Sequence, residues 1–360
     1  MKLANTIFCA VLLGLLLSCP SPAVAEGPGH TPVVEIRGDS AELGAQHGTL
    51  LGPQVRLLQE KYLNVYLRTD QVRAAALAGS KAFEPFIAPE HLAEVRGLSS
   101  TSGVDEPHIL MAQCFLDLQA MTACSTIALP AGASPDGVAR FGRNLDFPGL
   151  SIAENNSVLL IVHPKDRYAF AAVSWPGLIG VLSGMNERGL ALANMEVSRK
   201  PRMPSAMPYT LLYRTVLEKC KTVSEAITLL EATPKQTANN LMLMDASGDR
   251  AVVEITPENI TVRRAPETMA LISTNHQRGE DLQTPGKCVR YDRLLTDSTG
   301  AFGKIEESTV QKMLQSVAQP TMTMQSMVFE PSTRVLYLAT GPNAPSRGYE
   351  RIALKEYFAK

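Results

Sequence analysis

The spacing of apolar residues changes at Cys124, and this change limits the possible folds of the 360-residue chain more than any other feature of its sequence. Before Cys124, apolar residues such as Leu58 and Tyr62 recur at helical spacing, so a helix-rich region is expected over residues 40–119. After Cys124, short apolar runs are separated by turn residues, such as the Pro-Asp-Gly sequence at 135–137, which is typical of hairpins.

The expected strands and helices alternate in groups. Strands are predicted at residues 33–37, 124–129, 138–147, 158–163, 168–175, 179–185, 190–197, 240–245, 250–256, 270–275, 326–330 and 334–340. Further helices are predicted at residues 209–219, 223–232, 288–295 and 306–318. Strands that follow one another in hairpins favour antiparallel sheets, and the inserted helices favour outer helical layers, so we expect an α+β fold.

The N-terminus has the pattern of a targeting segment. Lys2 precedes an apolar run at residues 7–17, and small residues follow up to Ala25. This pattern predicts a signal peptide at 1–25 and export to the periplasm or the medium. Leu-Leu-Ser-Cys ending at Cys19 also resembles a bacterial lipoprotein site, so a lipid anchor at Cys19 stays open as an alternative. The apolar run is too short for a membrane span, and we expect none later in the chain.

Composition excludes several classes of partner. The net charge is -1, Lys and Arg form no run, and only 6% of residues are aromatic, which argues against nucleic-acid binding. The 6 histidines are scattered and no Cys-x-x-Cys is present, so neither a metal nor another cofactor is expected. Cleavage at residue 25 would leave Cys114, Cys124, Cys220 and Cys288, whose pairing the sequence does not decide.

Cys124 is a candidate nucleophile because it opens a predicted strand. If the bond after Ala123 were cut, Cys124 would gain an α-amino group with a pKa of about 7.7 to 8.0, close to the value of about 8.5 for a thiol. Such an amine can act as general base for its own side chain. The ordinary alternative is a buried, unreactive thiol.

Five polar residues accompany this cysteine. Arg143 can favour a thiolate and Asp146 can hold an amine, although residues three apart share one site only where a strand ends or bulges. Asn194 interrupts an apolar strand and Asn275 ends another, and an amide there can donate to an oxyanion. Arg290 lies on a predicted helix. Taken singly, these residues are also consistent with a surface ion pair, turn-capping amides and a surface arginine.

Taken in order, these motifs resemble the cysteine N-terminal-nucleophile hydrolases. After the cysteine come Phe-Gly-Arg-Asn-Leu-Asp-Phe at 141–147, Met-Asn-Glu-Arg-Gly-Leu at 185–190, Thr-Asn-His at 274–276 and Arg-Tyr at 290–291. The set is most similar to the autoproteolytic acyltransferase/hydrolase family typified by isopenicillin N acyltransferase (peptidase family C45), whose relatives include choloylglycine hydrolases and acid ceramidase. The resemblance implies a four-layer αββα sandwich of two antiparallel sheets flanked by helices.

The resemblance also implies self-cleavage into a small helical subunit, 26–123, and a catalytic subunit, 124–360, which stay associated. The thiolate would attack the amide of an N-acyl small molecule or peptide, and the thioester would pass its acyl group to water or an amine. Arg143 and Asp146 would flank the nucleophile, Asn275 would be the oxyanion or orienting amide, and Arg290 a structural-catalytic arginine.

The sequence departs from the family pattern at three places. The spacing around Asn194 differs from that of bile-salt hydrolases, Ala123 stands where glycine often precedes the nucleophile, and Phe147 stands where tryptophan is common. Two alternatives therefore remain. One is a non-catalytic exported ligand-binding protein on the same fold, and the other is an uncut cysteine hydrolase that uses His276 as its base.

Overall fold

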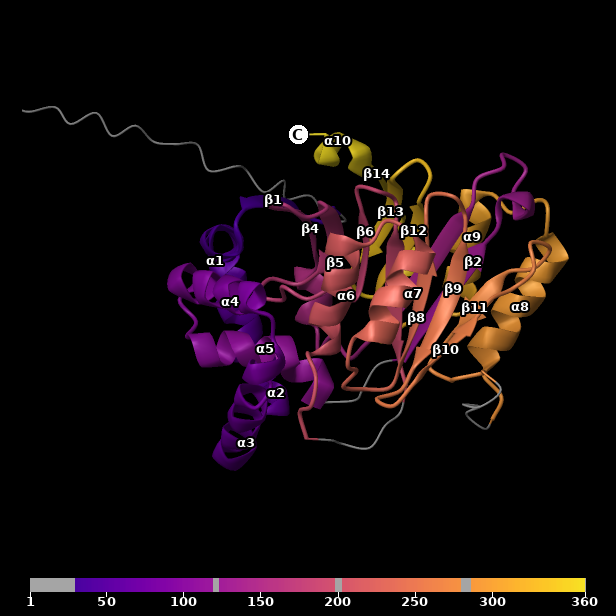
Figure 1. Ribbon diagram of the computed structural model, residues 1–360. Helices are drawn as coiled ribbons and strands as arrows, with labels where there is room; N and C mark the ends of the chain where they lie inside the picture. Colours follow the sequence, from indigo (N-terminus) through magenta and orange to yellow (C-terminus); the bar gives the residue numbers. More distant parts are fainter. Residues whose placement is uncertain (1–29, 119–122, 198–202, 280–285, 360) are drawn as a thin grey trace, which may run out of the picture.

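The computed structural model describes residues 30–118, 123–197, 203–279 and 286–359. Two β-sheets lie face to face, and helices cover their outer faces (Figure 1). This is the four-layer αββα arrangement of α+β class that the sequence predicts. The predicted signal peptide at 1–25, with Cys19, lies outside the described residues.

The first sheet has eight strands in the order β1-β4-β5-β6-β7-β8-β9-β10. They are β1 (Val33–Gly38), β4 (Val158–Pro164), β5 (Phe170–Ser174), β6 (Ser183–Asn186), β7 (Ala191–Glu196), β8 (Asn239–Met244), β9 (Arg250–Ile255) and β10 (Ile260–Arg263). Neighbours are antiparallel except β1 and β4, which run parallel, so the prediction of purely antiparallel sheets was wrong for this pair. A parallel pair needs a long crossover, which the intervening helices and first hairpin provide.

The second sheet has six strands in the order β11-β2-β3-β12-β13-β14, all antiparallel to their neighbours. They are β11 (Leu271–Ser273), β2 (Ala123–Leu129), β3 (Arg140–Asp146), β12 (Thr323–Glu330), β13 (Val335–Thr340) and β14 (Glu350–Ala353). Strand β2 lies against β7 and β8 of the first sheet, which brings the cysteine-bearing strand into the centre of the molecule. The sequence does not reveal β10 and β14, because each is a four-residue edge strand containing charged side chains.

Helices occupy three regions around the sheets (Figure 1). The N-terminal group is α1 (Ser40–Leu57), a π-helical turn η1 (Leu58–Leu63), α2 (Asn64–Tyr66), α3 (Asp70–Lys81), a 3-10 turn η2 (Glu84–Phe86), α4 (Pro89–Ser102) and α5 (Glu106–Leu118). Helices α6 (Tyr209–Lys219) and α7 (Val223–Ala232) contact the first sheet. Helices α8 (Val289–Ala301) and α9 (Glu307–Ser316) contact the second sheet, and α10 (Leu354–Phe358) follows β14.

Helices α1 and α4 pack backbone to backbone because glycines face each other between them. A Cβ atom at Gly44 would lie 2.0 Å from the main-chain oxygen of Glu94, and one at Gly97 would lie 2.2 Å from that of Ala41. Only glycine permits so close an approach. The contact fixes Glu94 on the side of α4 that faces the sandwich.

A buried ion-pair network joins the N-terminal helices to α6. Arg214 Nη2 lies 2.6 Å from Glu94 Oε2, and Arg214 Nε lies 2.8 Å from Glu218 Oε1. Arg167 Nη1 adds a contact of 2.7 Å to Glu218 Oε2. The side chains of Arg214, Glu94 and Glu218 are at most 2% exposed. Removing one partner of such a network typically costs about 3 to 5 kcal/mol, so it fastens the N-terminal segment to the sandwich.

Buried His91 makes stability depend on pH. Burial, with the charge of Arg214, lowers the pKa of His91 to about 3, and neither ring nitrogen has a hydrogen-bond partner among the described residues. The unfolded chain therefore takes up a proton near pH 6.5 that the folded chain refuses, so stability falls as pH falls below that value. We expect His91 to account for about 2 to 3 kcal/mol of the loss in unfolding free energy between pH 7.5 and pH 4.5.

Urea unfolding of the wild type and of His91→Leu at both pH values measures this contribution. The variant should lose about 2 to 3 kcal/mol less than the wild type on acidification. His47, whose pKa burial lowers to about 4, adds a loss of the same sign that remains in the variant. The comparison at pH 7.5 separates packing effects from titration, and an equal loss in both proteins would contradict the assignment.

Candidate active site

Residues far apart in the sequence meet at one end of three central strands of the second sheet. In the antiparallel ladder Cys124 lies opposite Leu145, and Ala123 lies opposite Asp146. Asp146 in turn lies opposite Thr323 of β12. The start of β2, the end of β3 and the start of β12 therefore lie side by side at this end of the sheet.

Asn275 and Arg290 hold the backbone of Cys124. The Cys124 N–H donates to Asn275 Oδ1 at 2.6 Å, and Arg290 Nη2 donates to the same oxygen at 3.0 Å. Arg290 Nη1 donates to the main-chain oxygen of Cys124. Because both neighbours of this amide oxygen are donors, the orientation of the Asn275 side chain is chemically determined. Its Nδ2 donates instead to the main-chain oxygen of Glu196 at 2.7 Å.

Asp146 is fully buried beside this group. Thr323 Oγ1 donates to its Oδ1 at 2.5 Å, Gln319 Nε2 donates to its Oδ2 at 3.0 Å, and Arg290 Nη1 lies 3.6 Å from Oδ2. Burial raises the pKa of Asp146, and these three neighbours oppose the rise. The register of the β3–β12 pairing shifts between Thr323 and Gln325, next to this carboxylate.

Arg143 reaches across to the other sheet. It is fully buried, and its Nε donates to Ser183 Oγ at 3.0 Å while Nη1 donates to the main-chain oxygen of Asn194 at 2.6 Å. Arg143 and Asp146 thus point in different directions, as expected for residues three apart in a strand. Both still affect the pKa of the Cys124 thiol, because the cysteine lies opposite the last residues of β3.

Cys124 is buried, with 1% of the residue exposed. Burial and the negative charge of Asp146 raise the pKa of this thiol, while the positive charges of Arg143 and Arg290 and the backbone N–H of Asp146 oppose the rise. The Nη2 atom of Arg143 is buried and has no hydrogen-bond partner in the described part of the chain.

Of the sequence-predicted residues, Asn194 is the one least directly involved. Its main-chain oxygen binds Arg143, while its side-chain Nδ2 lies 3.5 Å from Asn239 Oδ1. The structure thus links Asn194 to the site through Arg143. Cys124, Asp146, Asn275 and Arg290 are in direct or shared contact.

Several supporting residues were missed by the sequence analysis. Asn240 Nδ2 donates to the main-chain oxygens of Thr274 and His276, at 2.9 and 3.0 Å, and so clamps both sides of Asn275. Ser183, Gln319 and Thr323 position Arg143 and Asp146. The detectable signal was polar residues in otherwise apolar strands, such as Asn239-Asn240 before Leu-Met-Leu-Met, but sequence cannot say what those residues contact.

The remaining cysteines carry no visible chemistry. Cys114, Cys220 and Cys288 are buried and, like Cys124, unpaired, so none of the three possible disulfide pairings is formed among these residues. Burial raises the pKa of Cys220 to about 11 and that of Cys114 well above its ordinary value. The described ranges contain no group of His, Cys, Asp or Glu side chains that could hold a metal ion. None of the helices in those ranges has the length and hydropathy needed for a membrane span.

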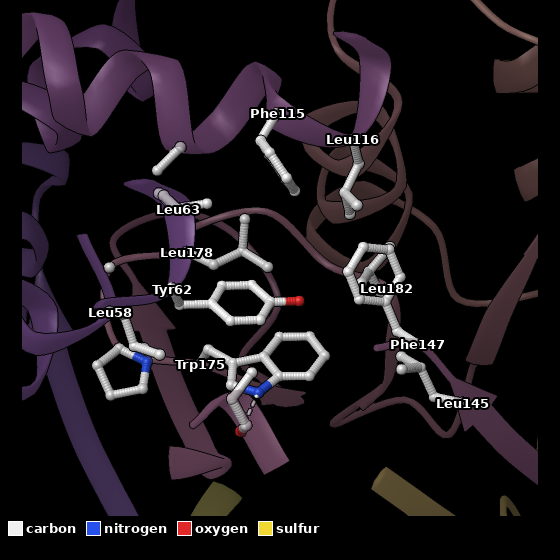
Figure 2. A pocket seen from close by; sticks show the side chains of 14 residues that line it. Leu58, Tyr62, Leu63, Phe115, Leu116, Leu145, Phe147, Trp175, Leu178 and Leu182 are labelled. Atoms are coloured by element: carbon white, nitrogen blue, oxygen red, sulfur yellow. Dashed lines mark hydrogen bonds between the residues drawn. The ribbon is translucent and has the colours of Figure 1, made fainter. Parts of the chain in front are cut away.

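A cavity of about 100 Å³ is enclosed by apolar and aromatic side chains (Figure 2). We call it the apolar pocket; its lining is Leu58, Tyr62, Leu63, Ala112, Phe115, Leu116, Leu145, Phe147, Ala153, Trp175, Pro176, Gly177, Leu178 and Leu182. Leu145 is the residue opposite Cys124 in the ladder. The polar atoms of the two amphipathic rings are bound to main-chain oxygens, Tyr62 to Pro148 at 2.9 Å and Trp175 to Ala153 at 2.8 Å. The pocket therefore presents aliphatic and aromatic surface.

Two stacked, mostly antiparallel sheets between helical layers are the fold of the N-terminal-nucleophile hydrolases. The family described as acyl-coenzyme A:6-aminopenicillanic acid acyl-transferase matches residues 133–344, and the chain belongs to this family. The matched segment begins after Cys124 and contains Arg143, Asp146, Asn275 and Arg290.

Two curated proteins show low sequence identity to this chain. Protein dcd1B of Dictyostelium discoideum is 25% identical over 57% of this chain and 46% of its own length. An uncharacterized protein of Archaeoglobus fulgidus is 21% identical over 64% of this chain and 44% of its own length. The chain thus spans about half the length of the curated relatives it matches.

Solved structures with similarity to this chain include three amide-acting proteins. An N-acylethanolamine-hydrolyzing acid amidase ortholog of Caenorhabditis elegans has 16% identity and a TM-score of 0.47, covering 58% of this chain and 93% of its own. A conjugated bile acid hydrolase mutant of Clostridium perfringens has 17% identity and a TM-score of 0.48, covering 65% and 93%. Penicillin V acylase of Agrobacterium tumefaciens has 17% identity and a TM-score of 0.41, covering 60% and 83%.

Proposed function

We propose that this protein is an exported, self-cleaving cysteine amide hydrolase or acyltransferase whose nucleophile is Cys124. The observation that carries the proposal is the hydrogen bond from the Cys124 main-chain nitrogen to Asn275 Oδ1, with Arg290 on both the Asn275 and Cys124 oxygens. An amine released at residue 124 would stay in this position. Family membership supports acyl-transfer chemistry, and the N-terminal sequence pattern supports export.

Self-cleavage would begin with attack of the Cys124 sulfur on the carbonyl carbon of Ala123. The C–N bond between these residues breaks, the nitrogen takes a proton, and water hydrolyses the resulting thioester at Ala123. The products are a carboxylate at Ala123 and a free α-amine on Cys124. We propose 26–123 and 124–360 as the two fragments, held together by the β1–β4 pairing and by the Arg214–Glu94 ion pair.

Turnover would use the new amine as the base. It accepts the thiol proton, the thiolate adds to the substrate carbonyl, and the proton then passes to the departing amine. Water or a second amine attacks the thioester and regenerates the thiol. Asn275 would orient the α-amine, because its Nδ2 is already bound to Glu196, and Arg143 Nη2 supplies positive charge near the sulfur. Asp146 would hold Arg290, and Asn194 would hold Arg143.

The apolar pocket indicates the acyl half of the substrate. Because Leu145 connects the pocket to Cys124, an aliphatic or aromatic acyl chain would enter it when the carbonyl reaches the sulfur. Burial of each methylene contributes about 0.8 kcal/mol, or roughly fourfold in kcat/KM. We therefore expect kcat/KM for chromogenic N-acyl anilides to rise roughly fourfold per methylene until the pocket is filled.

Rapid-mixing assays of the aniline released should also show a burst equal to the enzyme concentration when thioester hydrolysis limits turnover. As a matched variant, Leu178→Trp should fill the pocket and remove the gain for long chains while sparing acetyl anilide. If the protein binds these amides but hydrolyses none of them at any acyl chain length, the result would favour the non-catalytic binding alternative.

A further inference from the structure

A second cavity, of about 290 Å³, adjoins the candidate active site. Phe147 lines both this cavity and the apolar pocket, and so separates them. Thr323, which donates to Asp146, is also part of its lining. The cavity therefore lies at the same end of the central strands as Cys124, on the far side of Phe147 from the proposed acyl site.

Glu154 gives this cavity its chemical character. It lies on the 3-10 turn η4 (Ala153–Asn156), and its Oε1 accepts a hydrogen bond of 2.9 Å from the Ser151 N–H. Its Oε2 is buried and has no hydrogen-bond partner among the described residues. A buried carboxylate oxygen without a donor is unfavourable, so this atom is suited to receive one from a ligand.

The surrounding loop is shaped to accommodate the carboxylate. A Cβ atom at Gly149 would lie only 1.9 Å from Glu154 Oε2, so a side chain at that position would displace the carboxylate. The Cε atom of Met324 would lie 3.0 Å from the same Cβ position. The absence of a side chain at residue 149 thus creates the space that Oε2 occupies.

The lining of the cavity carries negative charge. Among the described residues that line it, Glu154 is the one charged side chain, and the other polar side chains are Ser151, Thr321, Thr323 and Asn343. Asp146 lies behind Thr323, and because Arg290 balances its charge, Glu154 supplies the negative charge of the lining. A negative lining of this kind favours ammonium groups and N–H donors and disfavours carboxylates.

We propose that this cavity binds the amine half of the substrate, and that Glu154 selects amides whose amine carries a second, positively charged amino group. This inference rests on the proposed function, because it places the scissile amide at Cys124 with the acyl chain in the apolar pocket. In acyl transfer, the same cavity would hold the accepting diamine. The substrate class is thus N-acyl diamines and amides of basic amino acids.

The test compares three amides that share one acyl group. Their amines are 1,4-diaminobutane, butylamine and 4-aminobutyrate, which are cationic, neutral and anionic at the far end. The acid released is common to all three and is quantified by mass spectrometry. We expect kcat/KM to be roughly tenfold higher for the cationic than for the neutral amide, and lowest for the anionic one.

Glu154→Gln is the informative variant because it keeps the size of the side chain and the bond to Ser151. It should bring the ratio of cationic to neutral kcat/KM close to one, whereas Glu356→Gln, an exposed change on α10, should leave the ratio as in the wild type. An unchanged ratio in Glu154→Gln, or no preference in the wild type, overturns the inference while leaving the amidase proposal intact.

A second measurement separates this inference from the proposed function. If none of the three amides is hydrolysed, the amidase proposal fails, and titration calorimetry with 1,4-diaminobutane then tests the cavity directly. Saturable binding to the wild type that weakens at least tenfold in Glu154→Gln supports the cation site. Equal binding to both proteins, or none, rejects it.

Discussion

Replacing Cys124 by alanine is expected to leave a single uncleaved chain and to lower amide turnover by roughly 10⁴- to 10⁶-fold, the range seen when a catalytic nucleophile or its partner is removed. The reason is that one sulfur atom serves both reactions, as attacker of the Ala123 carbonyl and of the substrate. Denaturing gels and intact mass measure cleavage. N-terminal sequencing of the wild-type large fragment should begin Cys-Ser-Thr-Ile.

The matched control is Cys220→Ala, which removes another buried thiol at the end of α6 and should leave cleavage and turnover as in the wild type. His276→Ala examines the alternative base. Because the proposed base is the α-amine of Cys124, we expect turnover to persist in this variant. An uncut wild-type chain that is active and loses its activity in His276→Ala would falsify the N-terminal amine mechanism.

Replacing Asn275 should have the next largest effect, and two variants separate its roles. Asn275→Leu leaves the Cys124 nitrogen and Arg290 Nη2 without their shared acceptor and so misplaces the base, and we expect a loss of roughly 10²-fold in kcat/KM. Asn275→Asp keeps the shape and both acceptor bonds, loses the donor bond to the Glu196 main-chain oxygen, and places a negative charge beside the α-amine. An opposite charge stabilises the ammonium form and raises its pKa.

The sign of the pH effect follows from the role of the amine. The base must be neutral to accept the thiol proton, so a raised pKa moves the acidic limb of the pH–kcat/KM profile toward higher pH, by about one unit or more. Measuring this profile for the wild type and Asn275→Asp checks the prediction. A profile that keeps its acidic limb while its maximum falls would mean that Asn275 supports only the structure.

Local patterns explain why so much of the fold was predictable. The alternation of apolar residues after Cys124 predicted the strands of both sheets apart from short edge strands, and helical spacing predicted α6, α7, α8 and α9. Motif order was enough to select the candidate residues. It did not reveal which atom of Asn275 faces Cys124, because that depends on Glu196 and Arg290 from other elements.

The residues that support the site illustrate the limit of sequence reasoning. Asn240, Thr323 and Glu154 sit in unremarkable local sequences, and their importance arises from contacts to residues distant in the chain or from a loop that leaves room for a side chain. No spacing rule encodes such contacts, because they depend on how strands and loops are brought together in three dimensions.

The amino-acid sequence alone determined the alternation of helices and strands, the candidate nucleophile and its family, because these depend on short-range periodicity and on residue identity. Only the tertiary structure decided that Asn275 and Arg290 hydrogen-bond to the backbone of Cys124. It also decided that Leu145, opposite Cys124, lines an apolar cavity and that Glu154 lines a second cavity. These features require side chains more than a hundred positions apart to come within hydrogen-bonding distance, which is a result of sheet packing and not of local pattern.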